Sequence, residues 1–292
     1  MSKCILITGA SGFTGSHAVK YFSERGYRVI GTSRRKVHSS YCVMENCDLS
    51  NLEQTLSVVK KHKPDLCLHL AGINSVAHSW SDPLSVIQSN VLGTFHLLEG
   101  MRLYSPSCKT IIAGSALSGS NHPYAVSKNL QQQLCTDWAK VFNLQVLSVR
   151  LCNLIGPGHS SGIVSLLAKR IVDMEIKEKT EPIELSHLLN EREFLDVRDA
   201  VACYDILFNK GESYSIYEIG SGKMTSLVKI LTIYQSLTTI QLSYSSIESK
   251  PDSSPKLMQS NSMRNLGWKP TYLLGNSLSE TLSFYRNHDI TN

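Results

Sequence analysis

A tyrosine and a lysine stand four positions apart in segment 124–128, YAVSK, with Ser115 upstream. Positions four apart share a helix face, so the spacing predicts that the Lys128 ammonium lies near the Tyr124 phenol. A neighbouring positive charge favours phenolate and lowers a pKa that starts at about 10. Such a phenol can exchange a proton with a carbonyl oxygen that the Ser115 hydroxyl shares. The alternative is a packed aromatic ring with a coincidental lysine.

Three glycines recur at every third position of segment 9–15, GASGFTG. The segment follows an apolar run, 4–8, typical of a strand, and it opens a helical pattern, 12–25. Glycines there allow a tight turn and bring the backbone close to a pyrophosphate, whose charge the helix N-terminus stabilises. The spacing is GxxGxxG rather than the commoner GxGxxG, so the strand-to-helix context carries the prediction of dinucleotide binding.

The second predicted strand, 28–32, lacks the acidic residue that usually follows it. About 20 residues past the glycines, a carboxylate normally binds the ribose 2′-hydroxyl of NAD, but after Glu24 the next carboxylate is Glu45. Ser33 and Arg34 follow the strand instead, and a guanidinium beside a hydroxyl suits a 2′-phosphate. We therefore expect NADP(H) as the preferred cofactor and NAD(H) as the alternative. The competing interpretation is a solvated basic turn.

Asp48 has two interpretations of equal standing. It follows the next strand in segment 46–49, NCDL, where its carboxylate could accept a hydrogen bond from adenine. It could equally be the N-cap of the helix that begins near Leu52.

The elements that must position these side chains alternate short strands with longer helices, as βαβ units do. We expect an α/β fold: a Rossmann-type doubly wound parallel sheet and a smaller C-terminal α/β substrate-binding domain. The domains are expected at 1–154 and 155–292, with about 193–210 returning to pack on the first. Predicted strands are 4–8, 28–32, 66–70, 110–113, 145–151 and 182–185. Predicted helices are 12–25, 52–62, 86–103, 125–142, 163–174 and 197–208. An exposed loop, 245–262, and a last amphipathic helix after Pro270 complete the chain.

Composition limits the partners. The chain has 292 residues, 42% hydrophobic and 18% charged, and none of its apolar runs approaches the roughly 20 residues that cross a bilayer. With no export signal at the N-terminus, we expect a cytoplasmic protein that does not bind membranes. The net charge of +5 is scattered, which does not favour nucleic acid. The eight cysteines lack metal-ligand spacing, so we expect reduced, mostly buried thiols and no metal.

Several ordered motifs together resemble one family, the extended short-chain dehydrogenases/reductases (NAD-dependent epimerases/dehydratases) that act on nucleotide sugars. The motifs are GASGFTG at 9–15, LAG at 70–72, NVLGT at 90–94, YAVSK at 124–128, RLCN at 150–153, GPG at 156–158, REFLDVRD at 192–199 and LGWKP at 266–270. Within the family the chain looks most like the GDP-4-keto-6-deoxy-D-mannose reductases, through GTSR at 31–34, SW at 79–80 and GHSSG at 158–162.

The resemblance implies residue roles. The implied catalytic residues are Ser115, Tyr124 and Lys128. Implied cofactor contacts, together with Ser33, Tyr124 and Lys128, are Gly9, Gly12, Phe13, Thr14, Arg34, Asp48, Leu49, Leu70, Ala71, Gly72, Asn90 and Leu151. A nucleotide-diphosphate sugar would be bound by Asn153, Lys169, Arg192 and Lys250. The alternatives for this last group are an asparagine in a turn and surface cations.

The implied activity is NADPH-dependent reduction of a nucleotide-linked 4-keto-6-deoxy sugar, in deoxysugar or surface polysaccharide biosynthesis. Ala116 and Leu117 stand where the family's dehydratases carry acidic residues, so dehydration is disfavoured. The loop between Ser115 and Tyr124 is shorter than is usual in the family, which leaves the sugar and base open. Two alternatives are a 4-epimerase with tightly held NAD and a non-catalytic dinucleotide sensor. In the family, helices matching 86–103 and 125–142 pair across a two-fold axis, which implies a homodimer.

Overall fold

The computed structural model of the chain describes residues 2–117, 122–247 and 256–288. These residues belong to two compact units. The first unit comprises Met1–Leu151, Val201–Ile219 and Ser262–Trp268, and the second comprises Cys152–Ala200, Gly220–Asn261 and Lys269–Asn292. Each unit is therefore built from three separate stretches of the chain.

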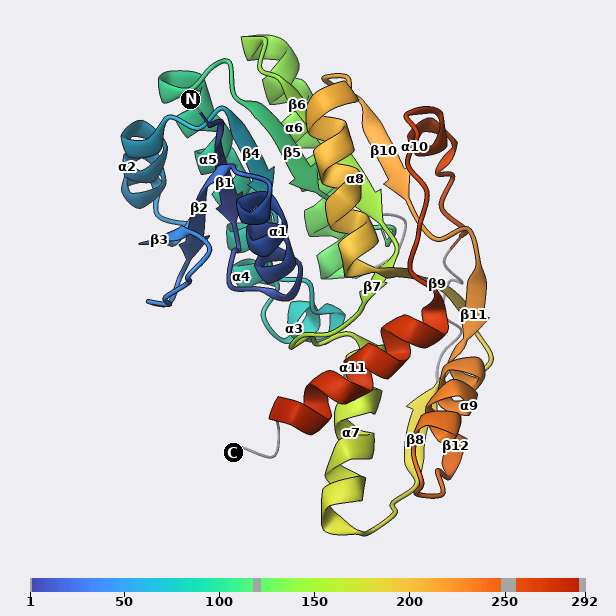
Figure 1. Cartoon of the computed structure of the whole chain (residues 1–292). Helices are drawn as coiled ribbons and strands as arrows, with labels where there is room; N and C mark the ends of the chain where they lie inside the picture. Colours follow the sequence, from blue (N-terminus) through green and yellow to red (C-terminus); the bar gives the residue numbers. More distant parts are fainter. Residues whose placement is uncertain (1, 118–121, 248–255, 289–292) are drawn as a thin grey trace. The chain divides into compact units, whose positions relative to one another are not determined.

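The first unit contains a seven-stranded parallel sheet whose strand order reverses at its middle (Figure 1). From one edge to the other, the strands are β10 (Ile216–Ile219), β6 (Val146–Leu151), β5 (Lys109–Ala113), β4 (Leu66–His69), β1 (Cys4–Thr8), β2 (Arg28–Ser33) and β3 (Val43–Asn46). The chain adds strands to one side of β1 and then, from β4 on, to the other side. This is the doubly wound order, in which ligands bind beyond the carboxyl ends of the strands at the reversal point. The predicted fold class is confirmed.

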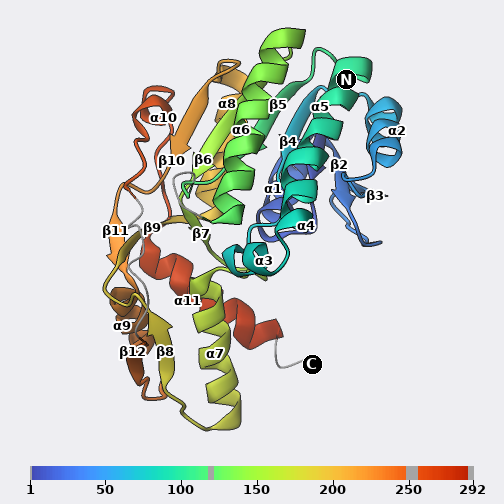
Figure 2. The same cartoon turned by 180° about the vertical axis from the view of Figure 1, so that it is seen from behind.

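Helices cover both faces of this sheet, as Figures 1 and 2 show from opposite sides. On one face, α1 (Phe13–Glu24) lies beside the part of α8 (Val197–Lys210) that begins at Val201, and the Phe22 and Phe208 rings meet edge to face. The other face carries α2 (Leu52–His62), α5 (Gly93–Tyr104) and α6 (Pro123–Phe142). Because the sheet is covered on both faces, all five residues of β1 are buried apolar or hydroxyl side chains, as its sequence CILIT indicates.

The predicted helix 86–103 is longer and less regular than expected. It starts at Pro83 with α4 (Pro83–Ile87), passes through a π-helical segment, η1 (Gln88–Leu92), and continues as α5. A short helix, α3 (Val76–Ser81), precedes it. π-Helical turns inside helices often occur at functional sites, and this one contains Asn90.

The second unit has two small sheets and three longer helices around its own apolar core. The elements are β7 (Asn153–Ile155), β9 (Glu191–Asp196) and β11 (Met224–Ser226) in one sheet, β8 (Ile183–Ser186) and β12 (Tyr244–Ile247) in the other, and helices α7 (Ile163–Lys177), α9 (Leu227–Leu237) and α11 (Leu274–His288). A further short helix is α10 (Asn261–Asn265). The predicted exposed loop 245–262 was wrong at its start, because β12 pairs with β8 through backbone hydrogen bonds that a serine-rich composition does not reveal.

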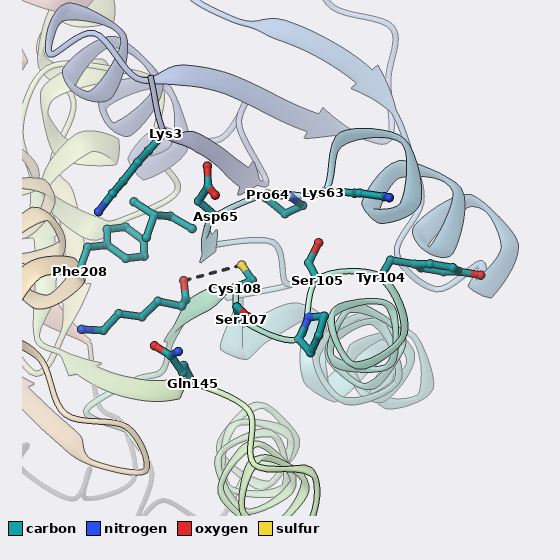
Figure 3. A pocket seen from close by; sticks show the side chains of 13 residues that line it. Lys3, Lys63, Pro64, Asp65, Tyr104, Ser105, Ser107, Cys108, Gln145 and Phe208 are labelled. Atoms are coloured by element: carbon teal, nitrogen blue, oxygen red, sulfur yellow. Dashed lines mark hydrogen bonds between the residues drawn. The ribbon is translucent and has the colours of Figure 1, made fainter. Parts of the chain in front are cut away.

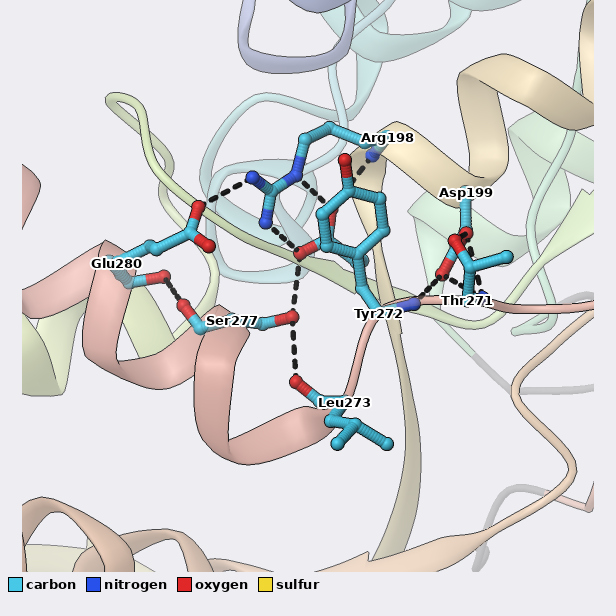
Figure 4. A network of polar contacts seen from close by, with 9 residues as sticks. Arg198, Asp199, Thr271, Tyr272, Leu273, Ser277 and Glu280 are labelled. Carbon is cyan, nitrogen blue, oxygen red and sulfur yellow. Dashed lines mark hydrogen bonds and ion pairs between the residues drawn. The ribbon is translucent and has the colours of Figure 1, made fainter.

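The motif at 192–199 organises polar contacts within the second unit (Figure 4). The Asp196 carboxylate has no solvent exposure, and the Arg198 guanidinium donates to both of its oxygens at 2.8 Å. The Ser277 hydroxyl of α11 donates to the same carboxylate at 2.6 Å, and Glu280 pairs with Arg198. These bonds join β9 to α11, so this motif has a structural role.

A pocket of about 520 Å³ opens at the amino ends of the strands in the first unit (Figure 3). Lys3, Asp65 and Lys109, which precede or begin β1, β4 and β5, contribute to its wall. The C-termini of α2 and α5 also reach this edge, and lysines complement the negative ends of helices. Lys109 donates to the Gly211 carbonyl at 2.7 Å. The pocket therefore lies at the edge opposite the one where such sheets bind nucleotides.

In the described parts of the chain, no helix combines the length and apolar character needed to cross a membrane.

Candidate active site

The glycine-rich turn joins the carboxyl end of β1 to α1. Gly9 has a φ of +67°, and a Cβ there would lie 2.9 Å from the Ala71 backbone, so this position requires glycine. The turn closes with a Gly12 N–H bond to the Gly9 carbonyl at 3.0 Å. Gly12 is the N-cap of α1, where no side chain caps the helix and the first turn has no acidic residue. The helix N-terminus is therefore available to an anion.

Ser33 and Arg34 lie beside this turn, at the carboxyl end of β2. The Ser11 hydroxyl donates to the Ser33 hydroxyl at 3.0 Å, which links the glycine-rich turn to β2. Asn46, at the end of β3, donates to the Arg34 carbonyl at 3.0 Å and so holds the backbone there. The Arg34 side chain itself is exposed. The strand expected before Asp48 was given no bounds, so this supporting role could not be assigned to Asn46 from the sequence.

Asp48 is not the N-cap of α2, because Asn51 holds that position and accepts a hydrogen bond from the Gln54 N–H at 3.0 Å. Asp48 instead accepts from the backbone and hydroxyl of Ser50 at 2.9 and 2.8 Å. Of the two interpretations drawn from the sequence, the N-cap is wrong. The adenine contact stays a prediction, as does the cofactor role of buried Leu49.

The segment after β4 lies against the glycine-rich turn. Leu70 and Ala71 donate their N–H groups to the Thr8 hydroxyl at 3.1 and 3.2 Å. Asn90 holds the backbone of Ile73, two residues after Ala71, accepting from its N–H at 2.8 Å and donating to its carbonyl at 2.9 Å. Asn90 is fully buried, so in this structure it supports the loop that was predicted to line the cofactor. Phe13 and Thr14, in the first turn of α1, are half-buried.

Ser115 follows β5 on an extended segment aligned along β6. The Gly114 and Ala116 N–H groups donate to the Val149 and Leu151 carbonyls at 2.7 and 3.0 Å, which fixes Ser115 at the carboxyl edge of the sheet. Tyr124, in the first turn of α6, is only 6% exposed. Burial raises the pKa of its phenol, and a hydrogen bond with the Ser115 side chain opposes that rise. Ser115 and Tyr124 are therefore brought together, as the sequence predicts.

The hydrogen-bond partners of the Lys128 ammonium differ from the one that the sequence predicts. Its ammonium donates to the Ala113 carbonyl at 2.9 Å and to the Gln131 side-chain oxygen at 2.6 Å. Burial lowers the pKa of Lys128 to about 8. The predicted lowering of the Tyr124 pKa by Lys128 is not what the structure shows, because burial dominates and the opposing influence comes from Ser115. Tyr124 is thus a protonated phenol at neutral pH.

The residues predicted to bind substrate belong to the second unit. β7 and β9 pair in parallel with Asn153 opposite Phe194, so Asn153 and Arg192 lie on the same face of their sheet. The Asn153 amide donates to the Glu193 carbonyl at 3.0 Å. Lys169 lies on the exposed side of α7. Lys250 lies outside the described residues.

A family model described as "NAD dependent epimerase/dehydratase family" matches residues 5–220. The chain belongs to this family. Among curated relatives, it is 27% identical to a GDP-6-deoxy-D-mannose reductase of Pseudomonas aeruginosa, over 97% of each chain. It is 23% identical to a UDP-glucose 4-epimerase of Yersinia enterocolitica, over 90% of this chain and 92% of the relative.

Solved structures give the same range of relatives. The structure of RMD from Pseudomonas aeruginosa complexed with NADPH has a TM-score of 0.85 and 24% identity, and covers 98% of this chain and 99% of its own. A UDP-glucose 4-epimerase of Thermotoga maritima with UDP-glucose has a TM-score of 0.87 and 23% identity, with 97% and 99% covered. This epimerase/dehydratase chain therefore has the family fold, and both reaction types occur among its relatives.

Proposed function

We propose that the protein reduces the C4 carbonyl of a nucleotide-linked 4-keto-6-deoxy sugar, with NADPH as the reductant. The observation that carries the proposal is the Ser33 and Arg34 pair at the end of β2, where an NAD-binding chain usually has an acidic residue. The buried Tyr124 phenol, with Ser115 beside it, could supply the proton. A reductase needs a proton donor for the carbonyl oxygen, whereas a 4-epimerase begins by removing a proton from a C4 hydroxyl. The epimerase returns that proton in its second half-reaction, so the phenol could serve either enzyme. The Ser33 and Arg34 pair, which suits NADPH, favours the reductase.

Each residue of the site has a separate role in the proposed reduction. When bound, NADPH supplies a hydride to C4. Tyr124 donates its proton to the O4 oxygen, so the products are the C4 alcohol and NADP⁺. The Ser115 hydroxyl holds the same oxygen. The Lys128 ammonium, which bonds Ala113 and Gln131, binds the cofactor with its remaining N–H. Ala116 and Leu117, which follow Ser115, offer no acid or base for dehydration.

The first unit offers a fitting place for the dinucleotide. The uncapped N-terminus of α1 and the tight turn at Gly9 suit a pyrophosphate. The Ser33 and Arg34 pair suits a 2′-phosphate, and the relative whose structure is described as an NADPH complex supports this choice. We propose Leu70, Ala71, Gly72 and Leu151 as further contacts, with Asn90 behind them.

For the sugar nucleotide, we propose that Asn153, Lys169, Arg192 and Lys250 bind the diphosphate and sugar, because cations suit a diphosphate. The GDP-6-deoxy-D-mannose reductase among the relatives supports a deoxysugar substrate. We further propose that the enzyme works in the cytoplasm, in deoxysugar or surface polysaccharide biosynthesis.

A 4-epimerase with tightly held NAD is the second candidate, and the UDP-glucose 4-epimerases among the relatives favour it. Assays of the purified protein distinguish the two activities. We expect NADPH consumption with one or more members of a panel of 4-keto-6-deoxy nucleotide sugars, and we expect the cofactor to exchange freely with solution. Protein that retains NAD through purification and interconverts C4 epimers without added cofactor would refute the reductase. Exchangeable cofactor with none of the panel consumed would favour a dinucleotide sensor.

Arg34→Ala should weaken NADPH binding by about 1.5 to 3 kcal/mol, the scale of a charge-assisted hydrogen bond, and leave NADH binding nearly unchanged. The measurement is the Kd of each cofactor by calorimetry. Arg28→Ala is the matched control, since Arg28 is an exposed arginine at the opposite end of β2. If Arg34→Ala weakened NADH as much as NADPH, the 2′-phosphate assignment would be wrong.

We propose a homodimer formed by α5 and α6, because these helices carry exposed apolar side chains. They include Leu103 at 44% exposure, Val126 at 49% and Leu130 at 48%. Light scattering at micromolar concentration should give twice the chain mass, and Leu130→Asp should give the monomer mass. Leu166→Asp, at a 52% exposed leucine on α7, should leave the dimer intact. A monomeric wild-type protein would contradict the proposal.

A further inference from the structure

A chain of hydrogen-bonded polar side chains runs through the buried interior of the first unit, from β1 to α6. Its successive polar atoms lie 2.6 to 2.8 Å apart. None of its side chains is more than 8% exposed. In order, the members are Thr8, His69, Thr94, Gln131 and Lys128.

The direction of each hydrogen bond near Lys128 follows from donor counts. An ammonium only donates, so the Gln131 oxygen faces Lys128 and its NH₂ group donates to the Thr94 hydroxyl. Thr94 gives its single proton to the Asn90 carbonyl at 2.6 Å. Both Thr94 lone pairs therefore accept, one from Gln131 and the other from the His69 Nε2–H at 2.8 Å.

Thr8, at the other end of this series of hydrogen bonds, determines the tautomer of His69. The Thr8 hydroxyl accepts from the Leu70 and Ala71 N–H groups, so its own proton points to His69 Nδ1 at 2.7 Å. A second ring proton on His69 would then meet no acceptor. Burial, with the nearby Lys128 charge, correspondingly lowers the pKa of His69 to about 3. His69 is therefore the neutral Nε2–H tautomer at any physiological pH.

We propose that Gln131 is the positioning residue for Lys128, and that neutral His69, acting through Thr94, holds the Gln131 amide in the required orientation. Two of the three ammonium donors of Lys128 go to Ala113 and Gln131, which leaves one N–H for a ligand. The proposal rests on the proposed role of Lys128 at the cofactor site. It adds that the same chain ties Lys128 to the Leu70–Ala71 backbone that borders that site.

The titratable groups near Lys128 are His69 from β4, and Tyr124 and Cys135 from its own helix. His69 is neutral above a pKa of about 3, burial raises the pKa of Cys135 to about 12, and burial also raises the pKa of Tyr124. Lys128, with a pKa of about 8, is thus the member of this group that loses charge in mildly alkaline solution. NADPH binding should weaken as the pH rises through about 8.

The test is the Kd of NADPH from about pH 7 to pH 10 for two substitutions at one position. Gln131→Glu has nearly the same shape and gives up the NH₂ bond to Thr94, but it places a carboxylate beside the ammonium. The carboxylate charge therefore raises the Lys128 pKa. The alkaline limit of binding, which is the pH above which NADPH affinity falls, should move up by about one pH unit or more. Gln131→Met keeps the length but removes the acceptor, so the limit should move down by a similar amount.

Gln132→Glu and Gln132→Met are the matched controls, because Gln132 is the next residue of α6 and bonds Arg150 instead of Lys128. They should keep the wild-type limit. Thr94→Val, like Gln131→Met, should lower the alkaline limit of NADPH binding. Thr94→Ser retains the hydroxyl and should keep the wild-type limit. Far-ultraviolet circular dichroism identifies variants that do not fold, and the Thr94 pair then supplies the result.

A limit that stays in place in both Gln131 variants, or that moves equally in the Gln132 controls, would overturn the proposal. So would wild-type binding with no alkaline limit in this range. Because binding needs no sugar, failure to reduce any 4-keto sugar would count against the proposed function alone.

Discussion

Tyr124→Phe should lower kcat on a 4-keto-6-deoxy nucleotide sugar by about 10²- to 10⁴-fold, the usual contribution of a general acid. NADPH affinity should barely change, because the substitution removes one hydroxyl from a ring that stays packed. Burial keeps the phenol protonated, and Ser115 is placed to share the carbonyl oxygen. Steady-state kinetics and calorimetry on the same preparation give both quantities.

Tyr214→Phe is the control, since Tyr214 is 36% exposed and precedes β10, at the edge of the sheet opposite the site. It should leave kcat and NADPH affinity at wild-type values. Wild-type NADPH oxidation by Tyr124→Phe with the best substrate would remove Tyr124 from the chemistry and favour the sensor. Lys128→Met should differ from both by impairing turnover and cofactor binding together.

Gly15→Ala should abolish most dinucleotide binding, with NADPH affinity about 100-fold lower or worse. A Cβ at Gly15 would lie 2.1 Å from the Gly9 carbonyl oxygen and 2.8 Å from Ala10 Cα, both of them backbone atoms. Relief of that overlap requires α1 and the glycine-rich turn to separate by about 1 Å, a displacement large enough for a loss of this order. Calorimetric titration with NADPH measures the effect.

Gly275→Ala is the matched control, because no atom lies within 4 Å of a Cβ built there. Its NADPH affinity should equal that of the wild type, and α11, which contains it, should be unchanged or slightly stabilised. Near-normal NADPH binding by Gly15→Ala would mean that the turn is not the pyrophosphate site.

The sequence allowed the main elements of the first unit to be predicted, because burial on both faces leaves a clear signal. Strand 4–8 and helix 52–62 were predicted with the bounds that β1 and α2 have. β3, the strand expected before Asp48, could not be given bounds because it is a short edge strand in which none of the four residues is fully buried. β12, with all four residues exposed, was missed for the same reason.

The parts of the site that lie within one sequence motif were predicted. The contacts between residues distant in the sequence were missed. Helical spacing placed Tyr124 and Lys128 on one face, but could not show that the Ala113 carbonyl and Gln131 take the ammonium. Gln131 stands three residues after Lys128 on the same helix, and that spacing is the signal that could have identified it. The link through Thr94 to His69 joins residues from separate elements, which only the fold brings together.

The ratio of NADPH oxidised to nucleotide sugar converted distinguishes net reduction from epimerisation. Cofactor absorbance follows NADPH, and chromatography of the sugar nucleotides follows conversion in the same reaction. The proposed reductase oxidises one NADPH for each 4-keto-6-deoxy sugar that becomes a C4 alcohol, and the ratio holds at every substrate concentration. Conversion of a nucleotide sugar with no net NADPH oxidation would rule out the reductase and identify an epimerase.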